Sequence, residues 1–163
     1  MIKYCRDKWG QNCDKLERFF KKTNYLGEYS YMDILMNAIK YILDDGKNPD
    51  ELDDGDWDYT KIHQIDDGSY QGTLMFLVSR ADTYQPAEYD YILTYIDYGS
   101  CSVCDTLQSI QSDYDYAETE VDKEQAIKDL MKLSGDLVNN IIVPYNHGWR
   151  EIQEYKQVEW KEN

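Results

Sequence analysis

The feature that most constrains the fold lies at residues 89–111, where an apolar strand pattern ends at a glycine and a Cys-x-x-Cys pair follows. Alternating side chains of residues 89–98 point to opposite sides, and both sides are largely apolar. This pattern predicts a central strand that is covered on both faces. Gly99 and Ser100 interrupt it, and Ser100 is a suitable N-cap for a helix that begins near Cys101.

Two further strands are expected before this one. Residues 61–65 lead into Asp66-Asp67-Gly68-Ser69, whose Asp-Gly pair is a strong hairpin signal, and residues 70–79 return as an apolar strand. Residues 80–88, with Pro86, then form a longer turn. The three strands therefore predict an antiparallel meander.

Helical patterns flank this meander. Asn12 is expected to cap a first helix, Ser30 and Asp33 form a capping box for a second, and Gly46 is suited to end it. Asp122, with Gln125 three residues later, is expected to cap a long helix that Pro144 ends. Residues 145–163 fit a short helix or an edge strand, and we favour a strand for residues 155–160.

The expected architecture is one α+β domain over residues 1–163. It has two N-terminal helices, an antiparallel sheet of three or four strands, two more helices and a C-terminal edge strand.

Charge decides the class of partner. The net charge is −15, which repels phosphate backbones and anionic membranes and favours basic protein surfaces or cations. Residues 1–24 are the exception, with seven Lys or Arg against three Asp or Glu. We interpret this basic helix as packing beside the acidic remainder; a contact for an anionic partner is the alternative. The chain starts without a signal peptide and has no long apolar run, so we expect a cytoplasmic protein and no membrane contact.

Acidic residues concentrate at residues 44–58, which hold eight carboxylates and one lysine around Pro49 and Gly55. A calcium-binding loop needs oxygen ligands at alternate positions and a glutamate at the twelfth. Counted from Asp50, the third position is Leu52 and the twelfth is Lys61, so the pattern fails. An exposed acidic loop is the simpler interpretation, and a non-specific divalent-cation site is the alternative.

Three interpretations compete for Cys101 and Cys104. A strand followed by Cys-x-x-Cys and a helix is similar to thioredoxin-like oxidoreductases, although the expected meander and the Ser-Val pair between the cysteines depart from them. The pair could instead be half of a zinc site completed by Cys5, Cys13, His63 or His147. The third interpretation is two small buried residues at a tight junction. The two histidines, His63 and His147, have no recognisable catalytic setting, so we do not expect an enzyme.

The sequence Tyr-Ile-Asp-Tyr-Gly-Ser-Cys-Ser-Val-Cys-Asp-Thr-Leu, at residues 95–107, resembles a signature of small acidic, uncharacterised bacteriophage proteins. Its shared core is Tyr-Gly-Ser-Cys-x-x-Cys-Asp-Thr-Leu. The resemblance implies a phage origin. Small acidic phage proteins often bind and block a host protein, so it also favours a binding function in the host cytoplasm.

These observations predict a non-enzymatic inhibitor that occupies the basic surface of a host nucleic-acid-binding protein, such as a defence nuclease or polymerase, without contacting nucleic acid itself. A zinc-stabilised or thiol-redox protein centred on the cysteine pair and a virion structural component are the alternatives. The expected partner-binding residues mimic phosphates with carboxylates and anchor with aromatic rings: Asp50, Glu51, Asp53, Asp54, Asp56, Trp57, Asp58, Tyr59, Asp113, Tyr114, Asp115, Tyr116, Glu118 and Glu120.

Overall fold

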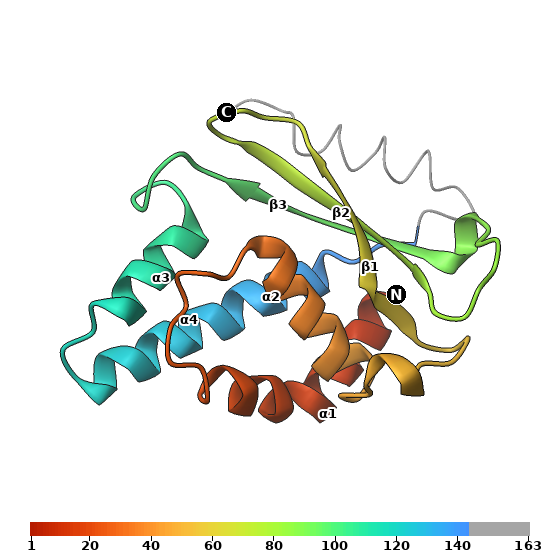
Figure 1. Cartoon of the computed structure of the whole chain (residues 1–163), viewed down its shortest axis with the longest axis horizontal. Helices are drawn as coiled ribbons and strands as arrows, with labels where there is room; N and C mark the ends of the chain where they lie inside the picture. The colour runs from red at the N-terminus through yellow and green to blue at the C-terminus, as the bar shows by residue number, and fades with distance from the viewer. Residues whose placement is uncertain (144–163) are drawn as a thin grey trace.

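The computed structural model describes residues 1–143 and confirms the α+β class, with helices before and after a three-stranded antiparallel sheet (Figure 1). Two single 3₁₀ turns, Pro49–Glu51 and Glu88–Asp90, lie in the connections. The main elements, in chain order, are α1 (Ile2–Phe20), α2 (Tyr31–Ala38), β1 (Trp57–Asp66), β2 (Gly72–Arg80), β3 (Tyr91–Tyr98), α3 (Thr106–Asp115) and α4 (Glu120–Asn139).

The sheet is the predicted meander, with strand order β1-β2-β3 and antiparallel pairing throughout. The position predicted for β3 was wrong, because β2 is the central strand. Among residues 1–143, β3 lies beside β2 alone, apart from one bridge between Leu93 and Ile142. Ile92 and Thr94 are buried, whereas Tyr91 and Tyr95 on the other side are half-buried. Tyrosine is often found partly exposed, so the face of β3 that carries these tyrosines does not need a second layer to bury it completely.

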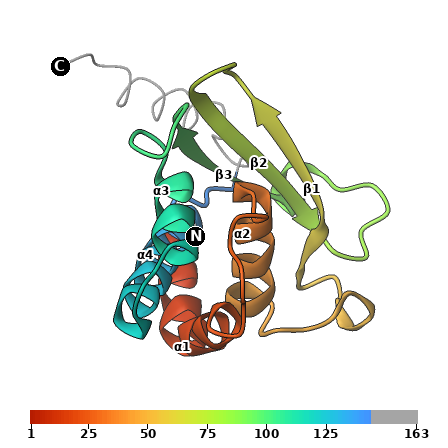
Figure 2. The ribbon, with the colours of Figure 1, turned by 60° about the vertical axis from the view of Figure 1, so that its left-hand side comes forward.

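The helices described by the structure form a second layer on one side of the sheet (Figures 1 and 2). Phe76, Val78 and Ile92 belong to the same buried cluster as Leu130 and Leu137 of α4. The Thr94 hydroxyl, buried in the same region, donates a hydrogen bond to the Leu137 carbonyl at 2.6 Å. Within residues 1–143, no helix combines the length and apolar character needed to cross a bilayer.

The first helix begins ten residues before the cap expected at Asn12. Asn12 lies in the middle of α1 with its side chain buried, so the prediction of its role was wrong. Its amide donates to the Ile42 carbonyl at 2.9 Å and to Asp45 Oδ1 at 2.6 Å. The same residue type that caps helices also satisfies buried carbonyls, and sequence alone does not separate the two uses.

The second helix starts as predicted, because Ser30 Oγ accepts from the Asp33 amide and Asp33 accepts from the Ser30 amide at 2.8 Å. It continues as a π-helical turn over Ile39–Leu43. Gly46 follows with φ +87°, a conformation that glycine adopts without strain. The predicted C-terminal stop is therefore confirmed.

The two later helices start at caps other than those predicted. Asp105, not Ser100, caps α3, and its side chain accepts from the Gln108 amide. Thr119 caps α4, and Asp122, the third residue of the helix, completes the capping box. The Cys-x-x-Cys pair therefore lies in the turn before α3, outside the helix. The α4 helix ends at Asn139, and both Pro144 and the strand predicted for residues 155–160 lie outside the described residues.

Candidate functional site

The acidic segment at residues 44–58 connects the π-helical turn to β1. Most of it is a loop, as predicted, but β1 already begins at Trp57. Trp57 pairs with Arg80 of β2, and a register shift separates this pair from the regular ladder that starts at Ile62. The last residues of the segment therefore belong to the sheet.

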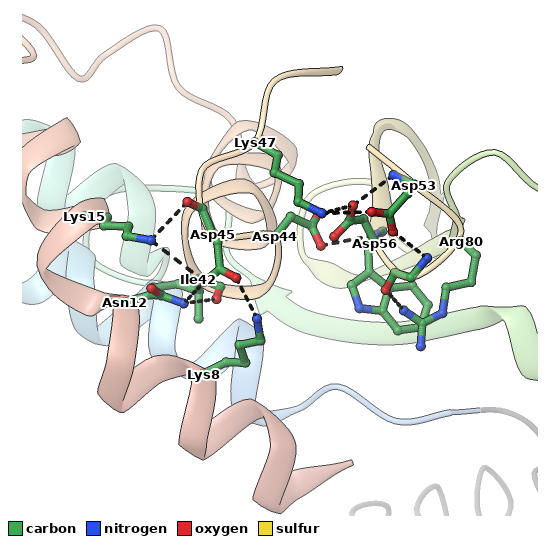
Figure 3. Close-up of polar contacts among 12 residues, drawn as sticks. Lys8, Asn12, Lys15, Ile42, Asp44, Asp45, Lys47, Asp53, Asp56 and Arg80 are labelled. Atoms are coloured by element: carbon green, nitrogen blue, oxygen red, sulfur yellow. Dashed lines mark hydrogen bonds and ion pairs between the residues drawn. The ribbon is translucent and has the colours of Figure 1, made fainter. Parts of the chain in front are cut away.

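Lys47, the one lysine of the segment, holds the loop together (Figure 3). Its ammonium group donates to Asp56 at 2.6 Å and to Asp53 at 3.2 Å. These hydrogen bonds raise the pKa of Lys47. Asp53 also accepts from the Gly55 amide at 2.9 Å, and this bond together with Lys47 lowers the pKa of Asp53. The loop is thus cross-linked by its own polar groups.

Further bonds tie the loop to its surroundings. The Tyr59 hydroxyl donates to the Lys47 carbonyl at 2.8 Å, and the Ala81 amide donates to the Asp56 carbonyl at 3.0 Å. The Glu51 carboxylate accepts from the Asn48 amide at 2.7 Å. The loop backbone is therefore fixed against β1 and against the start of the connection after β2.

Asp45 joins the acidic segment to the basic helix α1 (Figure 3). It accepts from Lys8 at 3.0 Å and lies 3.8 Å from the Lys15 ammonium, which also donates to the Asp45 carbonyl. Partial burial opposes ionisation, but the hydrogen bonds from Lys8 and Asn12 lower the pKa of Asp45. This arrangement supports the interpretation of α1 as a basic helix that packs beside the acidic remainder.

Asp44, the neighbour of Asp45, is only 1% exposed. Its Oδ1 accepts from the Trp57 amide at 3.1 Å, whereas Oδ2 has no hydrogen-bond partner among the described residues. Burial raises the pKa of Asp44 to about 7, and the nearby Asp56 carboxylate adds to the effect. The Arg80 guanidinium stacks on the Trp57 ring at 3.7 Å and also donates to the Gly55 carbonyl.

Three of the aromatic anchors expected from the sequence are buried. Trp57 is 1% exposed, and Tyr59 and Tyr114 are also in the core. Asp58 is buried as well, and it pairs with Lys61 at 2.7 Å. These three rings contribute their apolar area to the folded core, so the structure does not present them on the surface as the anchors that the sequence predicted.

Of the acidic residues expected to contact a partner from this segment, Asp50, Glu51, Asp53 and Asp54 are exposed. Asp56 is half-buried, and its carboxylate is occupied by Lys47.

A second loop, at residues 81–90, begins beside this segment. The bonds from Arg80 and Ala81 to Gly55 and Asp56 join the two, and both views place them at the same end of the molecule (Figures 1 and 2). Tyr84 in this loop is 95% exposed, and Asp82 is exposed with φ +50°. We call the exposed groups of the two loops the acidic loop face: Asp50, Glu51, Asp53, Asp54, Asp82 and Tyr84.

Sequence reasoning missed Tyr84 as a surface aromatic. The available signal was its place in a polar turn beside Pro86, where a large ring finds little to pack against.

The second acidic run predicted to bind a partner lies elsewhere. Residues 113–124 cover the end of α3, the short connection after it and the start of α4, at the opposite end of the molecule from the acidic loop face (Figures 1 and 2). Asp113, Tyr116, Glu118 and Glu120 are exposed, and Asp115 is half-buried and accepts from the Leu26 amide at 3.1 Å. The two runs therefore do not make one continuous surface.

The Cys-x-x-Cys turn is a separate feature. Cys101 and Cys104 are exposed free thiols with their sulfur atoms 3.0 Å apart, so the expectation of two buried residues was wrong. Gly99 packs so closely on the turn that an added Cβ would lie 2.8 Å from Cys104 Sγ. The resemblance noted at residues 95–107 thus covers a strand end, a tight turn and the cap of α3.

A zinc site was one of the alternative interpretations of this turn. Within residues 1–143, no three His, Cys, Asp or Glu side chains come together to hold a metal ion. Cys5 is buried and Cys13 is half-buried, both in α1, and His147 lies outside the described residues.

Comparison with known proteins gives no family assignment. The chain matches no family model, no curated protein and no solved structure.

Proposed function

We propose that this chain is a non-enzymatic binding protein whose acidic loop face occupies the basic, nucleic-acid-binding surface of a partner protein. The observation that carries the proposal is the Lys47-centred network, which fixes the loop while Asp50 and Asp54 remain exposed beside it. A phosphate mimic needs carboxylates at fixed spacing, because ordering a flexible loop on binding would cost conformational entropy.

Charge and aromatic area support the same proposal. The net charge of −15 steers the protein towards basic surfaces, and the acidic loop face also carries the exposed ring of Tyr84. Aromatic rings with a polar tip are common at the centre of protein interfaces. We propose a host defence nuclease or polymerase as the partner, because such enzymes bind phosphate backbones through basic surfaces.

Two matched variants test which end of the molecule binds. Asp50→Asn/Asp54→Asn removes two exposed charges from the acidic loop face, and Asp113→Asn/Glu118→Gln removes two from the opposite end. Each protein is immobilised, and bacterial lysate is passed over it at low and high salt. We expect a basic nucleic-acid-binding protein to be retained at low salt by the wild type and by the second variant only.

The purified partner then allows a quantitative test. The loop-face variant should bind about tenfold more weakly at low salt, since each exposed interfacial charge contributes roughly 0.5–1 kcal/mol. The wild type should also compete with nucleic acid for the partner. Binding that is insensitive to salt, or that is weakened equally by both variants, would refute the proposed surface.

A further inference from the structure

The exposed cysteine pair is a feature that the proposed binding function does not use. Cys101 Sγ and Cys104 Sγ are 3.0 Å apart, about 1 Å longer than a disulfide bond. Both thiols are free and exposed to solvent. A small movement within one turn would therefore bring the two sulfur atoms to bonding distance.

The fold holds this turn at both ends through Asp105, which is 3% exposed. Its carboxylate accepts from the Gly99 amide at 3.1 Å, before the turn, and from the Gln108 amide at 2.8 Å, after it. The Tyr31 hydroxyl of α2 donates to the same carboxylate at 3.2 Å. The two cysteines are thus held together by the tertiary structure as well as by their spacing.

Hydrogen bonds inside the turn distinguish the two sulfur atoms. Cys104 Sγ accepts from the Cys101 amide at 3.2 Å and lies 3.7 Å from Ser100 Oγ. The Cys101 thiol and then Ser100 lower the pKa of Cys104. The thiolate is the reactive form of cysteine, so Cys104 is the better nucleophile of the pair at neutral pH.

We propose that Cys101 and Cys104 form a thiol–disulfide exchange site for small-molecule disulfides. The Cys104 thiolate attacks one sulfur of the small disulfide, forming a mixed disulfide and releasing one small thiolate. Cys101 then loses its proton to solvent, and its thiolate attacks Cys104 Sγ, releasing the second small thiolate. The protein dithiol is oxidised by two electrons, and the small disulfide is reduced to two thiols.

The test uses the reduced full-length chain and 2-hydroxyethyl disulfide. This probe is uncharged, which avoids the repulsion that a net charge of −15 would exert on an anionic disulfide. Samples are quenched with an alkylating agent at intervals and analysed by intact-mass and peptide mass spectrometry. We expect rapid loss of two hydrogens, a link mapped to Cys101 and Cys104, and free thiols at Cys5 and Cys13.

Two variants establish the order of the steps. Cys101→Ser keeps a hydroxyl near Cys104 and should accumulate the mixed disulfide on Cys104. Cys104→Ser should react more slowly than Cys101→Ser, because the sulfur with the lowered pKa is gone. Circular dichroism confirms that each variant is folded, and peptide mapping of the wild type tests the site without any substitution.

Three results would overturn the proposal. The first is oxidation of Cys13 as fast as that of the turn, and the second is a wild-type mixed disulfide that never closes. The third is equal reactivity of the two single variants. A reductant added to the lysate experiment keeps the thiols reduced, so loss of partner binding and loss of exchange are separate outcomes.

Discussion

Replacing Asp44 with asparagine should make the protein more resistant to rising pH. Asp44 is buried, one of its oxygens lacks a partner among the described residues, and its pKa is raised to about 7. In the unfolded chain an aspartate has a pKa of about 3.9. Between these values the unfolded chain releases the Asp44 proton while the folded protein keeps it. The free energy of unfolding therefore falls as pH rises.

The size of the effect follows from the difference between the two pKa values. Each pH unit in this window lowers the free energy of unfolding by about 1.4 kcal/mol, and the whole window by about 4 kcal/mol. At pH 5 about a third of that loss has occurred, and by pH 7.5 it is nearly complete. The asparagine side chain does not titrate. From pH 5 to pH 7.5 the free energy of unfolding of Asp44→Asn should therefore rise by about 2–3 kcal/mol relative to that of the wild type.

Urea unfolding of both proteins at pH 5 and pH 7.5 measures this difference, because the other titrating groups change the stability of the wild type and of the variant in the same way. Asp45→Asn is the matched control. The pKa of Asp45 is lowered, so its stabilising contribution is present above the unfolded pKa and is lost only as pH falls below that value. Its stability difference should stay constant from pH 5 to pH 7.5. Parallel pH profiles for the wild type and Asp44→Asn would refute the reasoning.

Three other substitutions test the contacts that shape the loops. Lys47→Met should speed amide hydrogen exchange in residues 48–56 about fivefold and lower global stability by only about 1 kcal/mol, since Lys47 and Asp53 are partly exposed and partly exposed ion pairs contribute little; unchanged exchange would contradict the role of Lys47. Asn12→Ala should lower the urea-unfolding free energy by about 1–3 kcal/mol, because the Ile42 carbonyl loses its donor. Gly99→Ala should displace the cysteine turn and slow disulfide closure in the mass-spectrometric assay, and closure at the wild-type rate would show that the turn has room for a methyl group.

Local signals in the sequence were enough for much of the fold. The capping box of Ser30 and Asp33, the stop at Gly46 and the three-stranded meander depend on neighbours in the chain, and the structure confirms them. The start of α1 could not be placed in the same way. Asn12 looks like a cap when only its neighbours are considered, whereas its hydrogen bonds reach residues about thirty positions away.

The candidate site also has a part that the sequence predicted and a part that it did not. Its carboxylates were predictable, because a loop with eight acidic residues and one lysine must expose most of its charge. Its aromatic part was not predictable, since Trp57 and Tyr59 are buried in the hydrophobic core while Tyr84 is exposed in a turn.

By itself, the sequence determined the charge, the secondary structure class and the spacing of the two cysteines. Only the tertiary structure decided that the loops at residues 44–58 and 81–90 meet, that residues 113–124 lie at the opposite end, and that the cysteine thiols face solvent. The physical reason is that burial and hydrogen bonding between distant segments depend on how the helices pack on the sheet, which periodicity along the chain does not encode.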